Sequence, residues 1–259
     1  MEPTEDGASI DAFHRGRFFL AQPLNGGHRA GMDAMMLAAA VPSGFGGLVA
    51  DLGAGAGGAG LAVLARCPQA RALLVEREPA MAAFARQTLA LEANAEIARR
   101  GSLLVADVAL AGRARTEAGL GDRSVDIAIM NPPFNEARDR QTPDGLRKAA
   151  HVMDDGLLER WIRTAAAIVR PSGAVALIAR PQSLAEILDA MGGRFGGLEV
   201  KPVHPRPDAD AIRVVVRGRR GSRRAMRLAA PLVLHAADGN RFTAHADAIC
   251  NGQASLFGD

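Results

Sequence analysis

A short apolar segment that runs directly into a glycine-rich turn constrains the fold of this chain more than any other feature of its sequence. Residues 48–52 read Leu-Val-Ala-Asp-Leu, residues 53–60 read Gly-Ala-Gly-Ala-Gly-Gly-Ala-Gly, and an Ala- and Leu-rich stretch follows. This order is typical of a buried strand, a tight turn and a helix at the start of a parallel α/β sheet. The glycines allow the backbone of the turn to approach a bound ligand closely.

Three further apolar segments have the character of strands, and each is followed directly by a polar residue. They are residues 72–75 before Glu76, residues 103–106 before Asp107, and residues 125–130 before Asn131. Strands alternate with helical segments from Leu48 to about Met191. We therefore expect an α/β fold with a Rossmann-like doubly wound, mostly parallel sheet. The strand-rich section from Leu198 through Leu234 is expected to add a C-terminal antiparallel hairpin.

The glycine-rich turn is compatible with two kinds of adenosine cofactor. Gly53, Gly55 and Gly58 satisfy the GxGxxG pattern, which serves dinucleotides as well as S-adenosylmethionine. Asp51 favours the second cofactor, because a carboxylate repels a pyrophosphate but attracts the ammonium and sulfonium groups of S-adenosylmethionine. At the ends of the next two strands, Glu76 can accept hydrogen bonds from the ribose hydroxyls and Asp107 can accept one from the adenine amine.

The tetrapeptide Asn131-Pro132-Pro133-Phe134 follows the strand at 125–130 and supplies the candidate catalytic residues. Asn-Pro is also a common turn dipeptide. Here the two prolines keep the chain extended, so that the Asn131 amide oxygen and the Pro132 carbonyl become fixed hydrogen-bond acceptors. Two acceptors suit one planar NH2 group, and the ring of Phe134 offers a stacking face. The pattern favours reaction at an exocyclic amine or a carboxamide nitrogen.

With these motifs, the chain resembles the class I S-adenosylmethionine-dependent amino-methyltransferases. Within that class it is most similar to the bacterial methyltransferases that act on an adenine exocyclic amine next to the anticodon of a valine tRNA. The resemblance spans most of the chain and includes the segment 22–33 and the NPPF motif. It implies a methyltransferase domain over residues 47–259, with residues 1–46 forming a leader and first helix of the same domain. The residues expected to contact the cofactor are Arg29, Asp33, Asp51, Gly53, Ala54, Gly55, Gly57, Glu76, Arg77, Asp107 and Val108.

The motifs specify methyl transfer to nitrogen more closely than they specify a substrate. Similar NPPF or NPPY motifs serve enzymes that methylate DNA adenine, ribosomal guanine or a glutamine amide in release factors. An adenine in tRNA is our first expectation, and a protein glutamine amide is the alternative within the same chemistry. Two alternatives from other classes remain open at this point: an NAD-dependent oxidoreductase and a non-catalytic adenosine-binding RNA module.

An arginine-rich segment near the C-terminus indicates a nucleic-acid partner. Seven arginines and no Asp or Glu lie between residues 213 and 227, with apolar segments at 214–216 and 228–234 on either side. We expect residues 217–224 to form the solvated tip of a hairpin that meets phosphates. The residues expected to contact RNA are Arg138, Arg140, Arg147, Lys148, Arg217, Arg219, Arg220, Arg223 and Arg224.

Composition agrees with an enzyme of this kind that works in the cytoplasm. The chain has 259 residues, 48% of them hydrophobic, which is enough to bury one sizeable core. Its two cysteines, Cys67 and Cys250, suggest neither a zinc site nor a disulfide framework, and we expect no metal. We also expect no membrane span and no signal peptide, because the chain has no long apolar run and starts with an acidic segment. The net charge of +3 and the pI near 9.5 permit a nucleic-acid partner.

Overall fold

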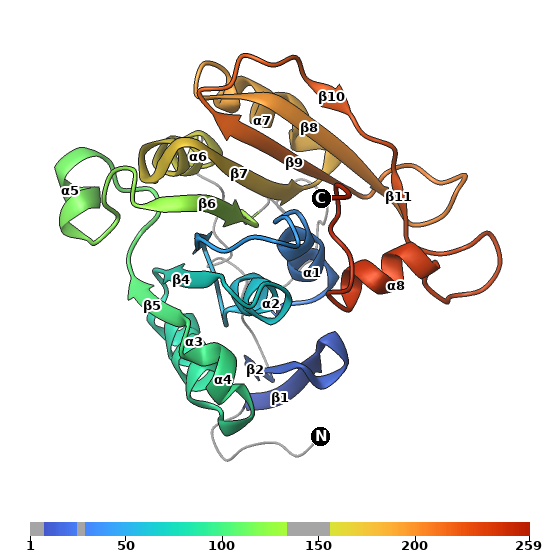
Figure 1. Ribbon diagram of the computed structural model, residues 1–259, viewed down its shortest axis with the longest axis horizontal. Helices are drawn as coiled ribbons and strands as arrows, with labels where there is room; N and C mark the ends of the chain where they lie inside the picture. The colour runs from blue at the N-terminus through green and yellow to red at the C-terminus, as the bar shows by residue number, and fades with distance from the viewer. Residues whose placement is uncertain (1–7, 25–28, 134–155) are drawn as a thin grey trace, which may run out of the picture.

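A twisted, mostly parallel sheet covered by helices on both faces forms the centre of the protein (Figure 1). The computed structural model describes residues 8–24, 29–133 and 156–259. Within these residues the strand order is β10-β8-β9-β7-β6-β3-β4-β5, with β11 beside β8. The strands are β3 Leu48–Leu52, β4 Arg71–Glu76, β5 Gly101–Val105, β6 Val125–Met130, β7 Val169–Ala179, β8 Phe195–His204, β9 Arg213–Arg220, β10 Arg227–Leu228 and β11 Leu232–Val233. This order confirms the predicted doubly wound α/β fold.

The α-helices pack on the sheet through two separate apolar cores. They are α1 Met32–Ala39, α2 Gly58–Arg66, α3 Pro79–Ala90, α4 Ala95–Ala98, α5 Gly112–Glu117, α6 Leu157–Ile168, α7 Leu184–Met191 and α8 Ala244–Cys250. In β6, Ile127 and Ile129 face the core that includes α1, α2 and α8, whereas Ala128 and Met130 face the core that includes α6 and α7. Because both faces of the central strands are covered, their sequences are almost continuously apolar. No helix in the described part of the chain is long and apolar enough to span a membrane.

The C-terminal antiparallel hairpin is present, but its strands differ from those predicted for the arginine-rich tip. Strand β9 pairs antiparallel with both β7 and β8, and the hairpin consists of β8 and β9. Strands β10 and β11 run parallel to β8, so residues 228–234 do not return alongside residues 214–216. The segment 217–224 is therefore not a hairpin tip, since its first four residues belong to β9.

An N-terminal hairpin that the sequence reasoning did not predict packs against α3 (Figure 1). Its strands are β1 Ala8–Phe13 and β2 Phe18–Pro23. The buried amide of Asn94 accepts from the Phe19 N–H at 2.9 Å and donates to the carbonyls of Phe19 at 2.7 Å and Thr88 at 2.8 Å. The Thr88 hydroxyl accepts from the Ala21 N–H at 3.0 Å. These contacts attach β2 to α3 and the turn that follows it.

Candidate active site

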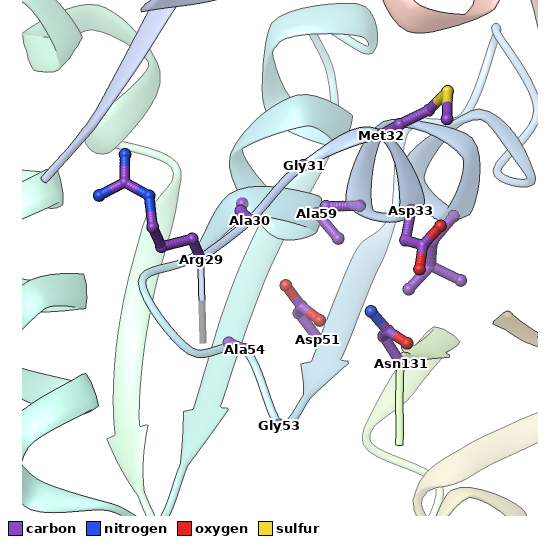
Figure 2. Close-up of a pocket in the computed structure, with 13 residues that line it drawn as sticks. Arg29, Ala30, Gly31, Met32, Asp33, Asp51, Gly53, Ala54, Ala59 and Asn131 are labelled. Atoms are coloured by element: carbon purple, nitrogen blue, oxygen red, sulfur yellow. The ribbon is translucent and has the colours of Figure 1, made fainter. Parts of the chain in front are cut away.

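A cavity of about 210 Å³ lies where β3 and β6 end, between the glycine-rich turn and the start of α1 (Figure 2). Strands β3 and β6 are parallel neighbours in which Leu52 pairs with Met130, so that Gly53 and Asn131 leave the sheet side by side. Ligands bind at this edge in open α/β sheets. The predicted site residues that line the cavity are Arg29, Asp33, Asp51, Gly53, Ala54 and Asn131.

The glycine-rich turn adopts a backbone conformation that depends on its glycines. Gly53, Gly55 and Gly57 have φ values of +75°, +56° and +94°, a region that side chains with a Cβ rarely adopt. At Gly53 a Cβ atom would also lie 2.5 Å from the ring of Trp161 on α6. The N–H groups of Gly53 and Ala54 donate to the Val75 carbonyl at 2.9 and 3.0 Å, which ties the turn to β4.

Asp51 places a buried carboxyl group on the wall of the cavity. The residue is 3% exposed, and its Oδ2 accepts from the Gly60 N–H at 2.8 Å. Burial raises the Asp51 pKa to about 7; the negative charge of Glu76 adds to this effect and the Gly60 hydrogen bond opposes it. A cation bound in the cavity would favour the ionised form. The carboxyl group therefore suits the ammonium and sulfonium end of S-adenosylmethionine.

Glu76 and Asp107 end neighbouring strands on the same edge of the sheet, as predicted, but lie outside the lining of the cavity. Glu76 accepts from the Gly55 N–H through Oε2 and from the Glu78 N–H through Oε1, both at 2.8 Å. The Asp107 Oδ1 accepts from the Ala109 N–H at 2.7 Å. The Arg77 guanidinium lies 3.5 Å from the Asp107 carboxylate. Val108, the residue after Asp107, is buried. Both acids are held in place by backbone donors at the edge where an adenosine would extend.

Arg29 and Asp33 line the cavity, but both already have partners within the protein. The Arg29 guanidinium donates to the Ser9 hydroxyl at 3.0 Å, the Pro23 carbonyl at 2.6 Å and the Asp11 carboxylate at 2.5 Å. Its side chain points away from Asp51 and Asn131 (Figure 2). The guanidinium holds the segment before α1 against the N-terminal hairpin, and the predicted contact between Arg29 and the cofactor stays a prediction.

Asp33 accepts from Arg213 Nε at 2.8 Å, so the first turn of α1 is joined to the start of β9. The ion pair connects the cavity wall with the C-terminal hairpin. Asp33 remains exposed to the cavity while it is paired. Asp33 thus has a structural role, and its role at the cofactor stays a prediction.

Among the catalytic candidates that the structure describes, only Asn131 lines the cavity. Its amide lies close to the Asp51 carboxyl in Figure 2, with Asp33 on the other side. Pro132 is buried and Pro133 is exposed, so the backbone that leaves the sheet has a fixed φ at two consecutive residues. Phe134 lies outside the described residues.

The predicted RNA-contacting arginines divide into three groups. Arg138, Arg140, Arg147 and Lys148 lie outside the described residues. Arg217 and Arg220 are corrections: Arg217 is buried in ion pairs with Glu199 and Asp259, and Arg220 donates to the carbonyls of Ala167 and Val169. Both residues belong to β9, which extends through residue 220. Their side chains join β9 to β8 and to β7. Arg219, Arg223 and Arg224 are exposed.

Two residues at the site were missed by sequence reasoning. Trp161, the single tryptophan of the chain, lies on α6 with its ring packed against the turn at Gly53. Asp11 holds Arg29 through an ion pair that joins the N-terminal hairpin to the cavity wall. Neither residue belongs to a motif, so only the three-dimensional arrangement identifies them. No group of His, Cys, Asp or Glu within the described ranges is arranged to hold a metal ion.

Comparison with known proteins identifies the class to which this fold and site belong. The chain belongs to the methyltransferase small domain family, which it matches over residues 29–202. It is 45% identical to a predicted O-methyltransferase, protein Atu636 from Agrobacterium tumefaciens, with a TM-score of 0.76 over 86% of this chain and 98% of that chain. M. jannaschii TYW2 in complex with AdoMet, that is S-adenosylmethionine, shares the fold at 10% identity, with a TM-score of 0.56 over 85% of this chain and 88% of that chain. The comparison with curated proteins found no match.

The protein is therefore an S-adenosylmethionine-dependent methyltransferase. This assignment sets aside the oxidoreductase and the non-catalytic module as alternatives. The cavity is compatible with the cofactor, because the buried Asp51 carboxyl group lies beside a turn whose glycine backbone leaves room for a ligand. When bound, S-adenosylmethionine supplies an electrophilic methyl group on a positively charged sulfur. The residues that would hold it are Asp51, Gly53, Ala54, Gly55, Glu76 and Asp107.

Proposed function

We propose that this protein transfers the methyl group of S-adenosylmethionine to the exocyclic amine of an adenine in RNA, with tRNA as the favoured substrate. The observation that carries the proposal is the position of Asn131, which leaves β6 next to Gly53 and lines the same cavity as Asp51. A substrate amine held at Asn131 lies beside the part of the cavity where a cationic cofactor group is favoured.

The proposed chemistry depends on alignment and electrostatics. Resonance delocalises the lone pair of an adenine amine into the ring. When the Asn131 amide oxygen and the Pro132 carbonyl accept its two N–H bonds, the nitrogen becomes more pyramidal and more nucleophilic. The leaving sulfur departs as a neutral thioether, and the amine releases its extra proton to water after the transfer. Asn131 and Pro132 therefore orient the nucleophile, and Pro133 keeps this backbone extended.

Two other substrates share part of this reasoning. A protein glutamine amide presents the same planar NH2 group to Asn131 and Pro132. Methylation of an oxygen is suggested by the description of the Atu636 protein as a predicted O-methyltransferase. We favour an RNA adenine because of the exposed arginines and the resemblance of the NPPF motif and segment 22–33 to the tRNA adenine methyltransferases.

The experiment that tests the proposal separates these substrates. Purified protein and tritiated S-adenosylmethionine are added to an extract of cells that lack the gene, and portions are then digested with RNase or with protease. We expect the acid-precipitable label to be lost on RNase treatment and retained on protease treatment. Label lost only to protease would contradict an RNA substrate and point to the glutamine amide.

A further inference from the structure

The seven arginines between residues 213 and 227 differ in whether the fold already uses their guanidinium groups. Four of them contact carboxylates or carbonyl oxygens inside the protein. These are Arg213 with Asp33, Arg217 and Arg227 with Glu199, and Arg220 with Ala167 and Val169. Arg219, Arg223 and Arg224 are exposed and have no acidic partner among the residues that the structure describes. Their charge remains available to a ligand.

These exposed arginines lie at the opposite edge of the sheet from the methyl-transfer cavity. The arrow of β9 points in the opposite direction to those of β6 and β7 (Figure 1). Arg220, at the end of β9, contacts the carbonyl of Val169, which pairs with the first residue of β6, Val125. Asn131 follows the other end of β6. At ~3.3 Å per residue, six residues of strand separate the two positions by about 20 Å.

Other groups at this edge extend the same positive surface. Arg123 is exposed, and its backbone N–H donates to the Ala167 carbonyl that the Arg220 side chain also contacts. Arg170 is 62% exposed, but Asp126 already balances its charge. The Gly197 N–H donates to the Arg224 carbonyl at 2.9 Å, which fixes the segment after β9 at this position.

A second cavity, of about 270 Å³, opens at this edge between β7, β8 and β9. Arg170, Arg217 and Arg219 line it together with the acids Asp126 and Glu199. Both acids are paired with arginines, and Glu199 is paired with two. The acids therefore do not neutralise Arg219 or the neighbouring Arg223 and Arg224.

We propose that Arg123, Arg219, Arg223 and Arg224 form a distal arginine surface that binds the phosphate backbone of the RNA substrate about 20 Å from the methylated nucleotide. This inference rests on the proposed RNA substrate and adds a requirement for its size. Guanidinium groups are suited to phosphate, and neutralising a phosphate releases counterions, which favours binding. An RNA that contacts the cavity and this surface together must extend around the edge of the sheet. The preferred substrate is therefore a folded RNA and not a free nucleoside or a short oligonucleotide.

The test compares two double variants of the full-length protein that remove equal charge. Arg223→Gln/Arg224→Gln removes two exposed arginines from the distal arginine surface, and Arg86→Gln/Arg99→Gln removes two exposed arginines near α3 and α4. Binding of unfractionated tRNA from cells that lack the gene is followed by fluorescence anisotropy at several salt concentrations. Cofactor binding is followed separately through Trp161 fluorescence, as a check that the fold is intact.

We expect Arg223→Gln/Arg224→Gln to bind tRNA about tenfold more weakly at moderate salt, with a salt slope smaller by about 1.5. The KM for tRNA should rise, while kcat at saturating tRNA and cofactor affinity stay unchanged. The control should resemble the wild type. Equal tRNA affinity and equal salt slope in the two double variants would overturn the proposal, even if tRNA is methylated. Weaker tRNA binding by the first variant supports the surface even if no RNA accepts a methyl group, a result that would count against the proposed function alone.

Discussion

Asn131 is the residue on which the proposed chemistry depends most, because its side chain lines the cavity directly beside Gly53. We predict that Asn131→Ala lowers kcat by on the order of 10²-fold, since one of two acceptors for the substrate amine is lost. Cofactor affinity should change little, because the Asp51 carboxyl and the glycine-rich turn remain. Single-turnover methyl transfer and titration of Trp161 fluorescence measure the two quantities. A variant with wild-type turnover would remove Asn131 from the mechanism.

We predict that Asp51 makes cofactor binding dependent on pH. Its pKa is raised from 3.8 to about 7 in the free protein, chiefly by burial. Ionised Asp51 attracts the cationic cofactor, so we predict that the apparent affinity for S-adenosylmethionine rises about fivefold between pH 6 and pH 7. Isothermal titration calorimetry measures this dependence. Asp51→Asn should bind more weakly and show no such rise; an equally steep rise in that variant would contradict the assignment.

The same pKa shift affects the stability of the ligand-free protein. The unfolded chain ionises Asp51 near pH 4, whereas the folded protein keeps this carboxyl protonated until about pH 7. This residue therefore contributes a loss of stability as the pH rises from about 4 to about 7, and no further loss above that range. Urea denaturation of the wild type and of Asp51→Asn across this range measures the contribution. The difference in the free energy of unfolding between the two should change with pH in this window.

Among the elements, the turn between β3 and α2 is sensitive to a single added methyl group. Gly53 and Gly55 both have positive φ, but only a Cβ at Gly53 would collide with Trp161. We predict that Gly55→Ala lowers the free energy of unfolding by about 1–2 kcal/mol through backbone strain alone, and that Gly53→Ala costs more. Urea denaturation followed by circular dichroism gives both values. If the two variants are equally stable, the contact with Trp161 has no energetic importance.

One buried side chain, that of Asn94, makes a large contribution to the attachment of the N-terminal hairpin. Asn94 is 1% exposed and forms three hydrogen bonds with the backbone of Phe19 and Thr88. Asn94→Ala leaves these buried groups without partners, and we predict a loss of about 3 kcal/mol in the free energy of unfolding. Hydrogen exchange should show the largest loss of protection in β2. Retained protection in β2 would show that apolar packing, including the fully buried Phe18, is sufficient to hold the hairpin.

At the scale of the whole molecule, the sequence was sufficient to predict the fold class and the strands whose ends form the candidate site. Strands β3, β4 and β6, which lead to Gly53, Glu76 and Asn131, are largely buried, whereas β5 before Asp107 is a partly exposed edge strand. Each appears in the sequence as an apolar run that ends at a candidate site residue. The C-terminal edge of a parallel sheet then brings these residues together. Local sequence therefore contained most of the information about the site.

The incorrect predictions concern side chains whose partners are distant in the sequence. Arg217 was expected in solvent because it belongs to a basic run, but Glu199 and Asp259 neutralise it inside the fold. Arg29 lines the cavity, but its ion pair with Asp11 of the unpredicted hairpin was not foreseen. A charged residue shows no sign of such a partner in its own neighbourhood of the sequence. Tertiary contacts alone determine which arginines remain free for a ligand.

Identification of the methylated atom is the most direct test of the central claim. Unfractionated tRNA from cells that lack the gene is incubated with the protein and S-adenosylmethionine, digested to nucleosides and analysed by mass spectrometry against standards. We predict a single new product, adenosine methylated on its exocyclic amine, which disappears when Asn131→Ala replaces the wild type. A methyl group on a ribose oxygen or on another base atom would contradict the proposed role of Asn131 and Pro132.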